Sequence, residues 1–431
     1  MTGTDLMTHL RVILRPDPSR TVVRPFEPAD LPQFANGTPR TQRIAERILA
    51  LDEEELDAEL ARIKASFPHG DLRLKQFLLD RIDHVPGLSI DRDAISEKQA
   101  LVIGGYFCEE YSFEAAALFN PTIVLADDQS GVAEGALRFI LGLRGIGEGH
   151  MSSITFRTGT WTPGGALVVD DPRPMAVPPH VRTSDGDAVH QHVVMDCGGS
   201  HDLSETVLFP VTSAQSKGVE DLRLVRFHEE DGGTSYLGTY TAFSGAEARS
   251  ELLRVGPDFK TFEMTPLKGA LAPTKGMALF PRRIDGRYAM LTRQDNENVW
   301  LAFSDDVLTW ETAEKVIPPR FSWEFVQMGN CGSPIEIEEG WLVITHGVGS
   351  VRNYCLGASL LDKDDPSKLL GRMRLPLVHP SPRERDGYVP NVVYSCGALV
   401  HDRTLLLPYG VADSFTTFAT VNVDRVLEAM A

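Results

Sequence analysis

Hydrophobic and polar residues follow two different patterns along the chain. Before about residue 117, apolar residues recur every three or four positions among charged ones, over 41–63 and again over 72–85. This spacing puts the apolar side chains on one face and predicts amphipathic helices. A further helix is expected over 95–118. Residues 1–30 carry four prolines, which exclude a long helix and predict an extended strap laid over another surface.

After Asn120 the pattern changes to short apolar runs rich in β-formers, separated by Gly, Asp and Asn turns. The runs repeat as a unit: an opening segment, a hairpin with an acidic or Gly-rich turn, and a last strand that ends in an Asp-rich loop. Three of these units read ALFPRRIDGRYAMLTRQ with VWLAFSDD, SPIEIEEGWLVITHGV with YCLGASLLD, and NVVYSCGALVHDRTLLLPYG with FATVNVD.

The spacing of the opening segments indicates the architecture. They lie near Phe119, Val219, Gly276, Gly332 and Val389, and the last four follow one another about every 57 residues. That period suits the blades of a β-propeller. The first interval is about 100 residues, which predicts a long loop through 185–204. We therefore expect an all-β five-bladed β-propeller over 117–431, preceded by a strap and α-helical extension over 1–116.

The opening segments also carry polar side chains where apolar ones are usual. Because the first strands of propeller blades converge on a central channel, these side chains are expected to meet at its mouth. They are Asn120, Asp221, Lys275, Glu336 and Asn391. Such a convergence of charged and amide groups suits the binding of a polyol.

Charge and composition restrict the partners. The net charge of −18 disfavours binding to nucleic acid or to an anionic membrane surface. No apolar run approaches the length of a membrane span, and residues 1–15 lack the features of a secretory signal, so a cytoplasmic location is expected. Five scattered cysteines fit reduced, buried thiols. His190, His192 and His201 share one loop without the spacing of metal ligands, so neither a metal nor another cofactor is expected.

Several motifs follow one another between about Phe119 and Leu427: LFNP, GVEDLR, KGMALFPRRIDGRYAMLTR, WLAFSDDVLTWE, GWLVITHGV, LLDKDDPSK and GYVPNVVYSCGALV. In this order they resemble the β-mannoside phosphorylases and β-mannosidases of glycoside hydrolase family 130. The resemblance implies a five-bladed propeller, in agreement with the repeat count. Helical extensions in some members of the family imply a homo-oligomer.

The resemblance also implies roles for individual residues. Asp221 occupies the place of the general acid, within a motif where Leu222 replaces the family's proline. Enclosure in a channel is expected to raise its pKa. Arg144 is expected to contact the sugar, with Asn120, Glu220, Arg223, Lys275 and Asn391 completing the substrate site. The alternatives are structural pairs of Asp221 with Arg223 or Arg226, and of Arg144 with Glu148.

Further family positions gather groups that bind phosphate. Arg293, His346 and Tyr354 match them, as does Asn120. A cation pointing inward from a strand is costly unless an anion or a carboxylate meets it, so Arg293 is the strongest of these. The alternatives are an ion pair between Arg293 and Asp295, a core histidine at His346 and a packed aromatic ring at Tyr354.

Two departures from the family pattern leave the nucleophile open. Gln327 stands where the phosphorylases have a phosphate-binding lysine, and Glu336 stands where they tend to have another. Phosphate would lose charge-assisted contacts, while Glu336 could deprotonate water as the base of an inverting hydrolase. We therefore hold three hypotheses: phosphorolysis of β-mannosides to mannose 1-phosphate with inorganic phosphate as co-substrate, which we favour slightly; hydrolysis by an inverting β-mannosidase; and non-catalytic sugar binding.

Overall fold

The computed structural model describes residues 6–28, 30, 37–66, 72–184, 191–381 and 387–430. The chain forms two compact units, one of Met1–Arg20 with Ser112–Ala431 and one of Thr21–Tyr111. The N-terminal twenty residues therefore belong with the larger unit, and the domain boundary expected between residues 116 and 117 stays a prediction. Among the described residues, no helix is long and apolar enough to cross a membrane.

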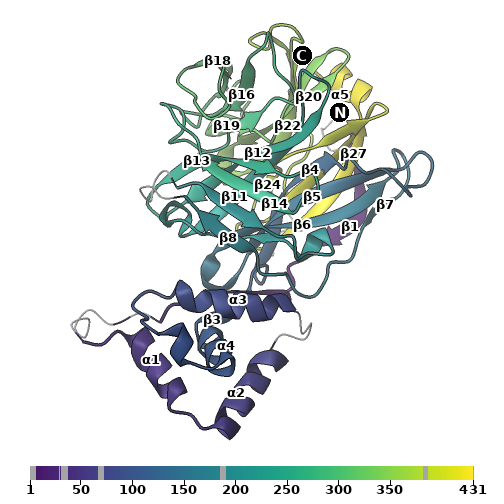
Figure 1. The fold of residues 1–431 in the computed structure, drawn as a ribbon. Coiled ribbons are helices and arrows are strands. Elements are labelled where there is room, and N and C mark those ends of the chain that lie inside the picture. Colours follow the sequence, from purple (N-terminus) through teal and green to yellow (C-terminus); the bar gives the residue numbers. More distant parts are fainter. Residues whose placement is uncertain are drawn as a thin grey trace. The chain divides into compact units, whose positions relative to one another are not determined.

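The smaller unit holds four α-helices around its own apolar core (Figure 1). Capping boxes at Asp52 with Glu55 and at Ser96 with Gln99 begin the second and fourth of them. A Cβ at Gly104 would lie 2.0 Å from the carbonyl oxygen of Leu78, so glycine allows the third and fourth helices to pack closely. The elements are β2 (Thr21–Pro25), α1 (Arg40–Leu49), α2 (Glu53–Ala65), α3 (Leu72–Asp83), η3 (Arg92–Ala94), α4 (Glu97–Tyr106) and β3 (Cys108–Ser112).

The helix expected over 95–118 is wrong beyond Tyr106. Residues 108–112 form β3, which pairs with β2 instead of continuing α4. Two adjacent glycines, Gly104 and Gly105, weaken the helix just before it ends. The phenylalanine and tyrosine side chains beyond it are buried in a strand and the turns beside it.

The larger unit consists of antiparallel strands in consecutive groups. The first two groups share one eleven-stranded sheet through a single parallel pairing of Gly218 with Ser152. The first contains β4 (Ala117–Leu125), β5 (Leu137–Ile146), β6 (Ser152–Trp161), β7 (Leu167–Val169) and β10 (Val207–Leu208); the second contains β8 (His180–Thr183), β9 (Val193–Asp196), β11 (Gly218–His228), β12 (Thr234–Phe243), β13 (Ala248–Val255) and β14 (Thr261–Pro266).

Three separate sheets follow. The last one includes β1, so a strand near the N-terminus pairs with β27 near the C-terminus. The first of the three contains β15 (Ala278–Leu279), β16 (Tyr288–Thr292), β17 (Val299–Ser304) and β18 (Ala313–Ile317). The second contains β19 (Gln327–Asn330), β20 (Ile335–Ile337), β21 (Gly340–Val348), β22 (Tyr354–Leu361) and β23 (Leu369–Arg372). The third contains β1 (Thr8–Leu14), β24 (Val393–Tyr394), β25 (Leu399–His401), β26 (Thr404–Val411) and β27 (Phe415–Asn422). Short helices complete the unit: η4 (Glu148–His150), η5 (Leu203–Glu205), η6 (Ser213–Gln215), η7 (Ser350–Arg352) and α5 (Val423–Glu428).

Buried apolar side chains connect neighbouring groups. One cluster joins β11–β13 to β15 and β16, a second joins β16–β18 to β19, β21 and β22, and a third joins β20–β22 to β24, β26 and β27. A fourth joins β26 and β27 back to β4 and β5. In the part of the chain that the structure describes, these sheets do not close into one hydrogen-bonded ring. The five-bladed propeller therefore stays a prediction.

Each of the five opening segments contains one residue with a left-handed backbone. Two of them interrupt the register of a strand as β-bulges, at 119–122 in β4 and 220–223 in β11. The five residues and their φ angles are Asn120 (47°), Asp221 (53°), Gly276 (86°), Gly332 (92°) and Asn391 (61°). The repeat found in the sequence is thus a repeat of local backbone geometry, with a polar side chain at Asn120, Asp221 and Asn391 and glycine at the other two positions.

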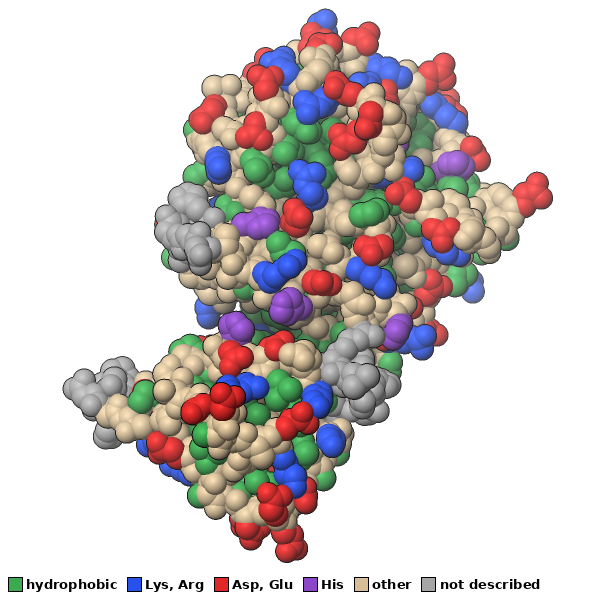
Figure 2. All heavy atoms as spheres, in the orientation of Figure 1, with side chains coloured by type: hydrophobic (Ala, Val, Ile, Leu, Met, Phe, Trp, Pro, Cys, Tyr) green, Lys and Arg blue, Asp and Glu red, His purple; other side chains and the backbone are tan. Residues whose placement is uncertain are grey.

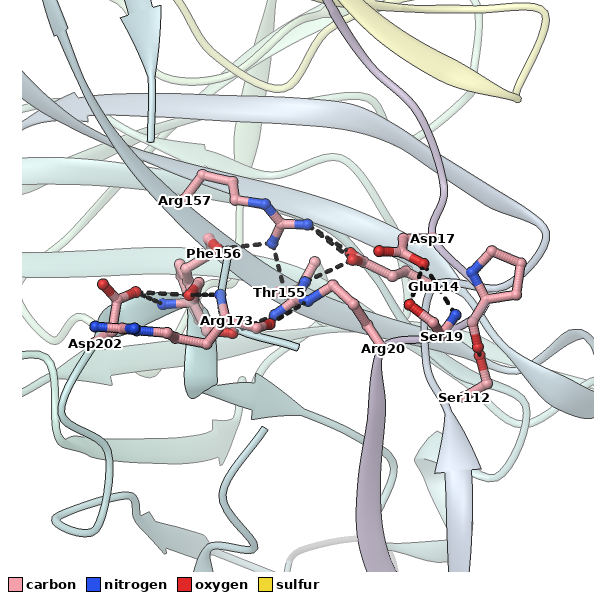
Figure 3. A network of polar contacts seen from close by, with 12 residues as sticks. Asp17, Ser19, Arg20, Ser112, Glu114, Thr155, Phe156, Arg157, Arg173 and Asp202 are labelled. Atoms are coloured by element: carbon pink, nitrogen blue, oxygen red, sulfur yellow. Dashed lines mark hydrogen bonds and ion pairs between the residues drawn. The ribbon is translucent and has the colours of Figure 1, made fainter. Parts of the chain in front are cut away.

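A buried charge cluster fastens the N-terminal segment to the larger unit (Figure 3). Glu114, whose side chain is 0% exposed, accepts hydrogen bonds from Arg20 and from Arg157 of β6. Arg20 also donates to the carbonyl oxygens of Arg173 and Ser204. One carboxylate therefore holds together three segments that lie far apart in the sequence.

Candidate active site

Asp221 lies at the bulge of β11, in contact with two side chains from the neighbouring strands. Its Oδ1 accepts from Asn120 Nδ2 at 2.7 Å and from Arg144 Nη1 at 3.0 Å. Arg144 also donates to Glu220 Oε1 at 2.6 Å and to Ser152 Oγ at 3.0 Å. Four predicted residues therefore form one group, which we call the Asp221 group: Asp221, Glu220, Asn120 and Arg144. The guanidinium of Arg144 binds Asp221 and Glu220 and not Glu148, the alternative partner.

One amide oxygen of this group has no partner. Asn120 is 7% exposed, and its Oδ1 makes no hydrogen bond within the described residues. A buried polar atom without a partner costs about 1–3 kcal/mol. A sugar hydroxyl that donates to Asn120 Oδ1 would remove this cost, so this atom suits a substrate contact.

The pKa of Asp221 moves opposite to our expectation. Burial alone would raise it, but the charges of Arg144 and Arg223 outweigh burial and lower the pKa to about 2. Burial raises the pKa of Glu220, which Arg144 opposes and the charge of Asp221 reinforces. In this arrangement Asp221 is ionised at neutral pH, and it is the more acidic of the two neighbouring carboxyls.

A third carboxyl, Asp413, belongs to this group, and sequence reasoning missed it. It lies in the turn between β26 and β27 with a φ of 49°, and it interacts electrostatically with Arg144, Asp221 and Glu220. Burial raises its pKa to about 6. The sequence offers one signal, an aspartate in the turn between two strands. Nothing in the sequence places that turn beside β5 and β11.

A second group surrounds Arg293, the residue after β16. Arg293 is 6% exposed; it donates through Nη1 to His346 Nε2 at 3.0 Å and through Nε to the carbonyl oxygen of Lys275 at 3.4 Å. No carboxylate of a described residue lies within 4.0 Å of its guanidinium, and Asp295 binds Asn298 instead. A Cβ at Gly276 or at Gly329 would come within 3.0 Å of Arg293. Two glycines therefore make room for a buried cation that has no counter-ion among the residues that the structure describes.

His346 supports this cation in its neutral form. Burial lowers its pKa well below the usual value, and the charge of Arg293 lowers it further. Because Nε2 accepts from Arg293, the proton lies on Nδ1, which is 3.6 Å from Cys331 Sγ. The ring of Tyr354 stacks on His346 at 6.3 Å between centroids, and the Tyr354 amide donates to the carbonyl oxygen of Asn391.

Arg223 connects the two groups. It donates to the Tyr394 hydroxyl at 2.8 Å and to the Asp221 carbonyl oxygen at 3.5 Å, and the Tyr394 ring lies 5.0 Å from that of His346. Lys275 is exposed, and its charge acts on both Asp221 and Glu220. Lys275 also supplies the carbonyl oxygen that Arg293 contacts. The candidate sugar-binding and phosphate-binding residues therefore adjoin each other.

The structure does not support Glu336 as a base facing Asp221. The Glu336 carboxylate accepts two hydrogen bonds from Arg282, each 2.9 Å long, and forms an ion pair with Lys363. These contacts lower its pKa. Glu336 is exposed on the short strand β20, which follows the left-handed turn at Gly332. Its partner Arg282 also lies over the Trp341 ring. The carboxylate gained at this position is thus already paired elsewhere.

Surface charge and metal ligands add no competing site. On the face drawn in Figure 2, acidic and basic side chains are interspersed over the larger unit. Within the described residues, no group of three or more His, Cys, Asp or Glu could hold a metal ion. The long loop of 185–204 lies outside the described residues over 185–190.

Comparison with known proteins identifies the family. A family profile described as beta-1,4-mannooligosaccharide phosphorylase matches residues 188–431. A 1,2-β-oligomannan phosphorylase from Thermoanaerobacter sp. (strain X514) is 36% identical over 228 residues, which cover 52% of this chain and 75% of that protein. A β-1,2-mannobiose phosphorylase from Listeria innocua is 30% identical over 232 residues, 52% of this chain and 63% of that protein.

The fold agrees with these matches. The solved structure of β-1,2-mannobiose phosphorylase from Listeria innocua with β-1,2-mannobiose superposes with a TM-score of 0.51 at 22% identity. The superposition covers 74% of this chain and 92% of that one. Together with the profile match, it shows that the chain belongs to glycoside hydrolase family 130.

Proposed function

We propose that this protein is a β-mannoside phosphorylase, which transfers a mannosyl group to inorganic phosphate with inversion and releases mannose 1-phosphate. We further propose that its larger unit is a five-bladed β-propeller. Three features support that architecture: the five left-handed turns, the strand pairing that joins the first two groups, and the apolar clusters that join each later group to the next and the last to the first.

The observation that carries this proposal is the buried guanidinium of Arg293. Its positive charge has no carboxylate partner among the described residues, and it rests on a neutral histidine and a carbonyl oxygen. A buried charge without a partner is costly unless an anion binds it. Phosphate supplies such an anion, and planar guanidinium groups bind phosphate oxygens well.

Asp221 and its neighbours complete the reaction. Arg144 is the main charge that holds the pKa of Asp221 down, whereas burial acts to raise it. When Arg144 turns to a sugar hydroxyl, the largest charge that lowers this pKa is removed, the pKa rises, and Asp221 can carry the proton that the leaving sugar needs. Hydrogen phosphate then attacks the anomeric carbon, the glycosidic C–O bond breaks, and the phosphate proton replaces the one that Asp221 gives away. Atoms and charge balance without another reactant.

Hydrolysis is the weaker candidate on the same contacts. An inverting hydrolase needs a second carboxylate about 6.5–9.5 Å from the acid to activate water. Glu336, which we considered for this role, is occupied by Arg282 and Lys363. The relatives reported above are named as phosphorylases.

Dependence of the rate on phosphate tests the proposal. The purified chain is incubated with β-1,2- and β-1,4-mannobiose across a range of phosphate concentrations. We expect a rate that saturates with phosphate and is negligible without it, and we expect Asp221→Asn to lose a factor of about 10²–10⁴ because proton transfer contributes that much. Release of mannose at the same rate with and without phosphate would instead support hydrolysis.

A further inference from the structure

Two exposed rings of the larger unit pair with each other and have no role in the reaction proposed above. Tyr388 is 77% exposed, and its ring centroid lies 6.0 Å from that of His150, with 32° between the planes. His150 is exposed as well. The two residues are distant in sequence, so the pair exists only in the folded larger unit.

His150 is positioned by the strands that carry Arg144. It ends η4, the turn between β5 and β6, with a φ of 57°. Two residues later, Ser152 Oγ accepts the hydrogen bond from Arg144 Nε. The imidazole therefore lies at the outer end of the strand pair that holds the sugar-binding arginine.

Tyr388 is positioned by the turn that carries Asp413. The amide of Val389 donates to the carbonyl oxygen of Ala412 at 3.1 Å, and a Cβ at Gly387 would lie 2.4 Å from the same oxygen. Glycine at 387 thus lets the segment press against Ala412, directly before Asp413. His150 therefore lies two residues before Ser152, which binds Arg144, and Tyr388 lies directly before Val389, which binds the residue that precedes Asp413.

A polar group lies at the same rim. Arg352 ends the turn η7, and its charge acts on Asp413. Val351 and Arg352 both have left-handed backbones, with φ angles of 50° and 55°. Such a conformation is a true outlier for a β-branched residue, and outliers of this kind concentrate at binding sites. The Arg352 guanidinium itself lies over the Tyr354 ring, 5.8 Å from its centroid. Exposed aromatic rings suit a pyranose ring, which presents a C–H face, and a guanidinium suits its hydroxyls.

We propose that Tyr388 and His150 bind the sugar on the leaving side of the scissile bond, and so determine which acceptor the enzyme uses. This inference rests on the proposed function, in which the buried group around Asp221 holds the sugar that is transferred. The glycosidic oxygen must then lie next to Asp221, and the following sugar extends outward to the exposed rings.

Binding without turnover tests the inference. Titration calorimetry measures β-1,2- and β-1,4-mannobiose binding to Asp221→Asn, alone and combined with Tyr388→Ala, Tyr388→Phe or His150→Ala. We expect Tyr388→Ala to weaken the binding of at least one of the two disaccharides tenfold or more, His150→Ala to weaken it less, and Tyr388→Phe to retain it within about threefold. Tyr106→Ala is the matched control, because Tyr106 is an exposed aromatic residue of the smaller unit, and it should change nothing.

The outcomes separate the two proposals. Unchanged affinity in Tyr388→Ala, or an equal loss in Tyr106→Ala, overturns the inference, as does the absence of mannobiose binding to every variant. If Tyr388→Ala weakens binding while the wild type forms no mannose 1-phosphate, the ring pair stands as a sugar site and the phosphorylase proposal fails. In the synthetic direction, Tyr388→Ala should raise KM for the acceptor sugar tenfold and change KM for mannose 1-phosphate by less than twofold.

Discussion

Replacement of Arg293 perturbs the phosphate site most selectively. A guanidinium carries five N–H donors. The Nε donor contacts the Lys275 carbonyl oxygen and one Nη1 donor contacts His346, which leaves three donors for an anion. The side chain is buried and has no carboxylate partner among the described residues, so its removal breaks no ion pair.

The expected loss follows from these free donors. Each hydrogen bond to a charged group contributes about 1.5–3 kcal/mol. Two such bonds to phosphate oxygens amount to about 3–6 kcal/mol, so Arg293→Ala should lower kcat/KM for phosphate by roughly 10²–10⁴. Arg293→Lys keeps the charge but not the paired donors, and it should lose less than Arg293→Ala.

The assay is steady-state kinetics of the wild type and the Arg293 variants, with the concentrations of phosphate and mannobiose varied separately. KM for phosphate should rise far more than KM for mannobiose, and the melting temperature of each variant shows whether the fold is retained. The reasoning is refuted if Arg293→Ala keeps kcat/KM for phosphate within twofold of the wild type, or if KM for mannobiose and KM for phosphate rise equally.

Three further substitutions test other parts of the account. Glu336→Gln should leave phosphorolysis within twofold of the wild type, because Arg282 and Lys363 hold this carboxylate away from Asp221; a loss above tenfold would restore Glu336 as a base. Glu114→Ala strands two buried arginines and should lower the free energy of unfolding by about 3–5 kcal/mol, seen as a lower melting temperature; an unchanged melting temperature contradicts this. Asp413 has a pKa raised to about 6, so the folded state holds its proton more tightly than the unfolded state, and stability falls as pH rises from about 4 to 6. Relative to Asp413→Asn, the wild type should lose on the order of 2 kcal/mol over that range in urea unfolding, and an equal difference at both pH values contradicts the raised pKa.

Local patterns predicted most of the elements. The helical spacing over 41–63 and 72–85 corresponds to α1, α2 and α3. The five opening segments each contain one left-handed residue, because Asn, Asp and Gly tolerate that backbone better than other residues. The helix expected over 95–118 is longer than α4 because the pairing of β3 with β2, more than 80 residues earlier, cannot be read from a local pattern.

The environment of each site residue was harder to predict. The resemblance selected Asp221, Arg144, Arg293 and His346, and the structure groups them as two adjoining clusters. The direction of the Asp221 pKa depends on how closely Arg144 and Arg223 approach the carboxylate, which no spacing in the sequence fixes. Asp413 belongs to the Asp221 group although it lies in a turn 192 residues further along the chain. Glu336 does not belong to this group, because its carboxylate binds Arg282.

The fate of inorganic phosphate during the reaction tests the central claim most directly. Phosphorus NMR follows the purified chain with β-mannobiose and phosphate in one tube. We predict that the inorganic phosphate signal is consumed and replaced by that of α-mannose 1-phosphate, in an amount equal to the bonds cleaved, and that Arg293→Ala slows this conversion. Cleavage of mannobiose to free mannose while the phosphate signal stays constant would contradict the account.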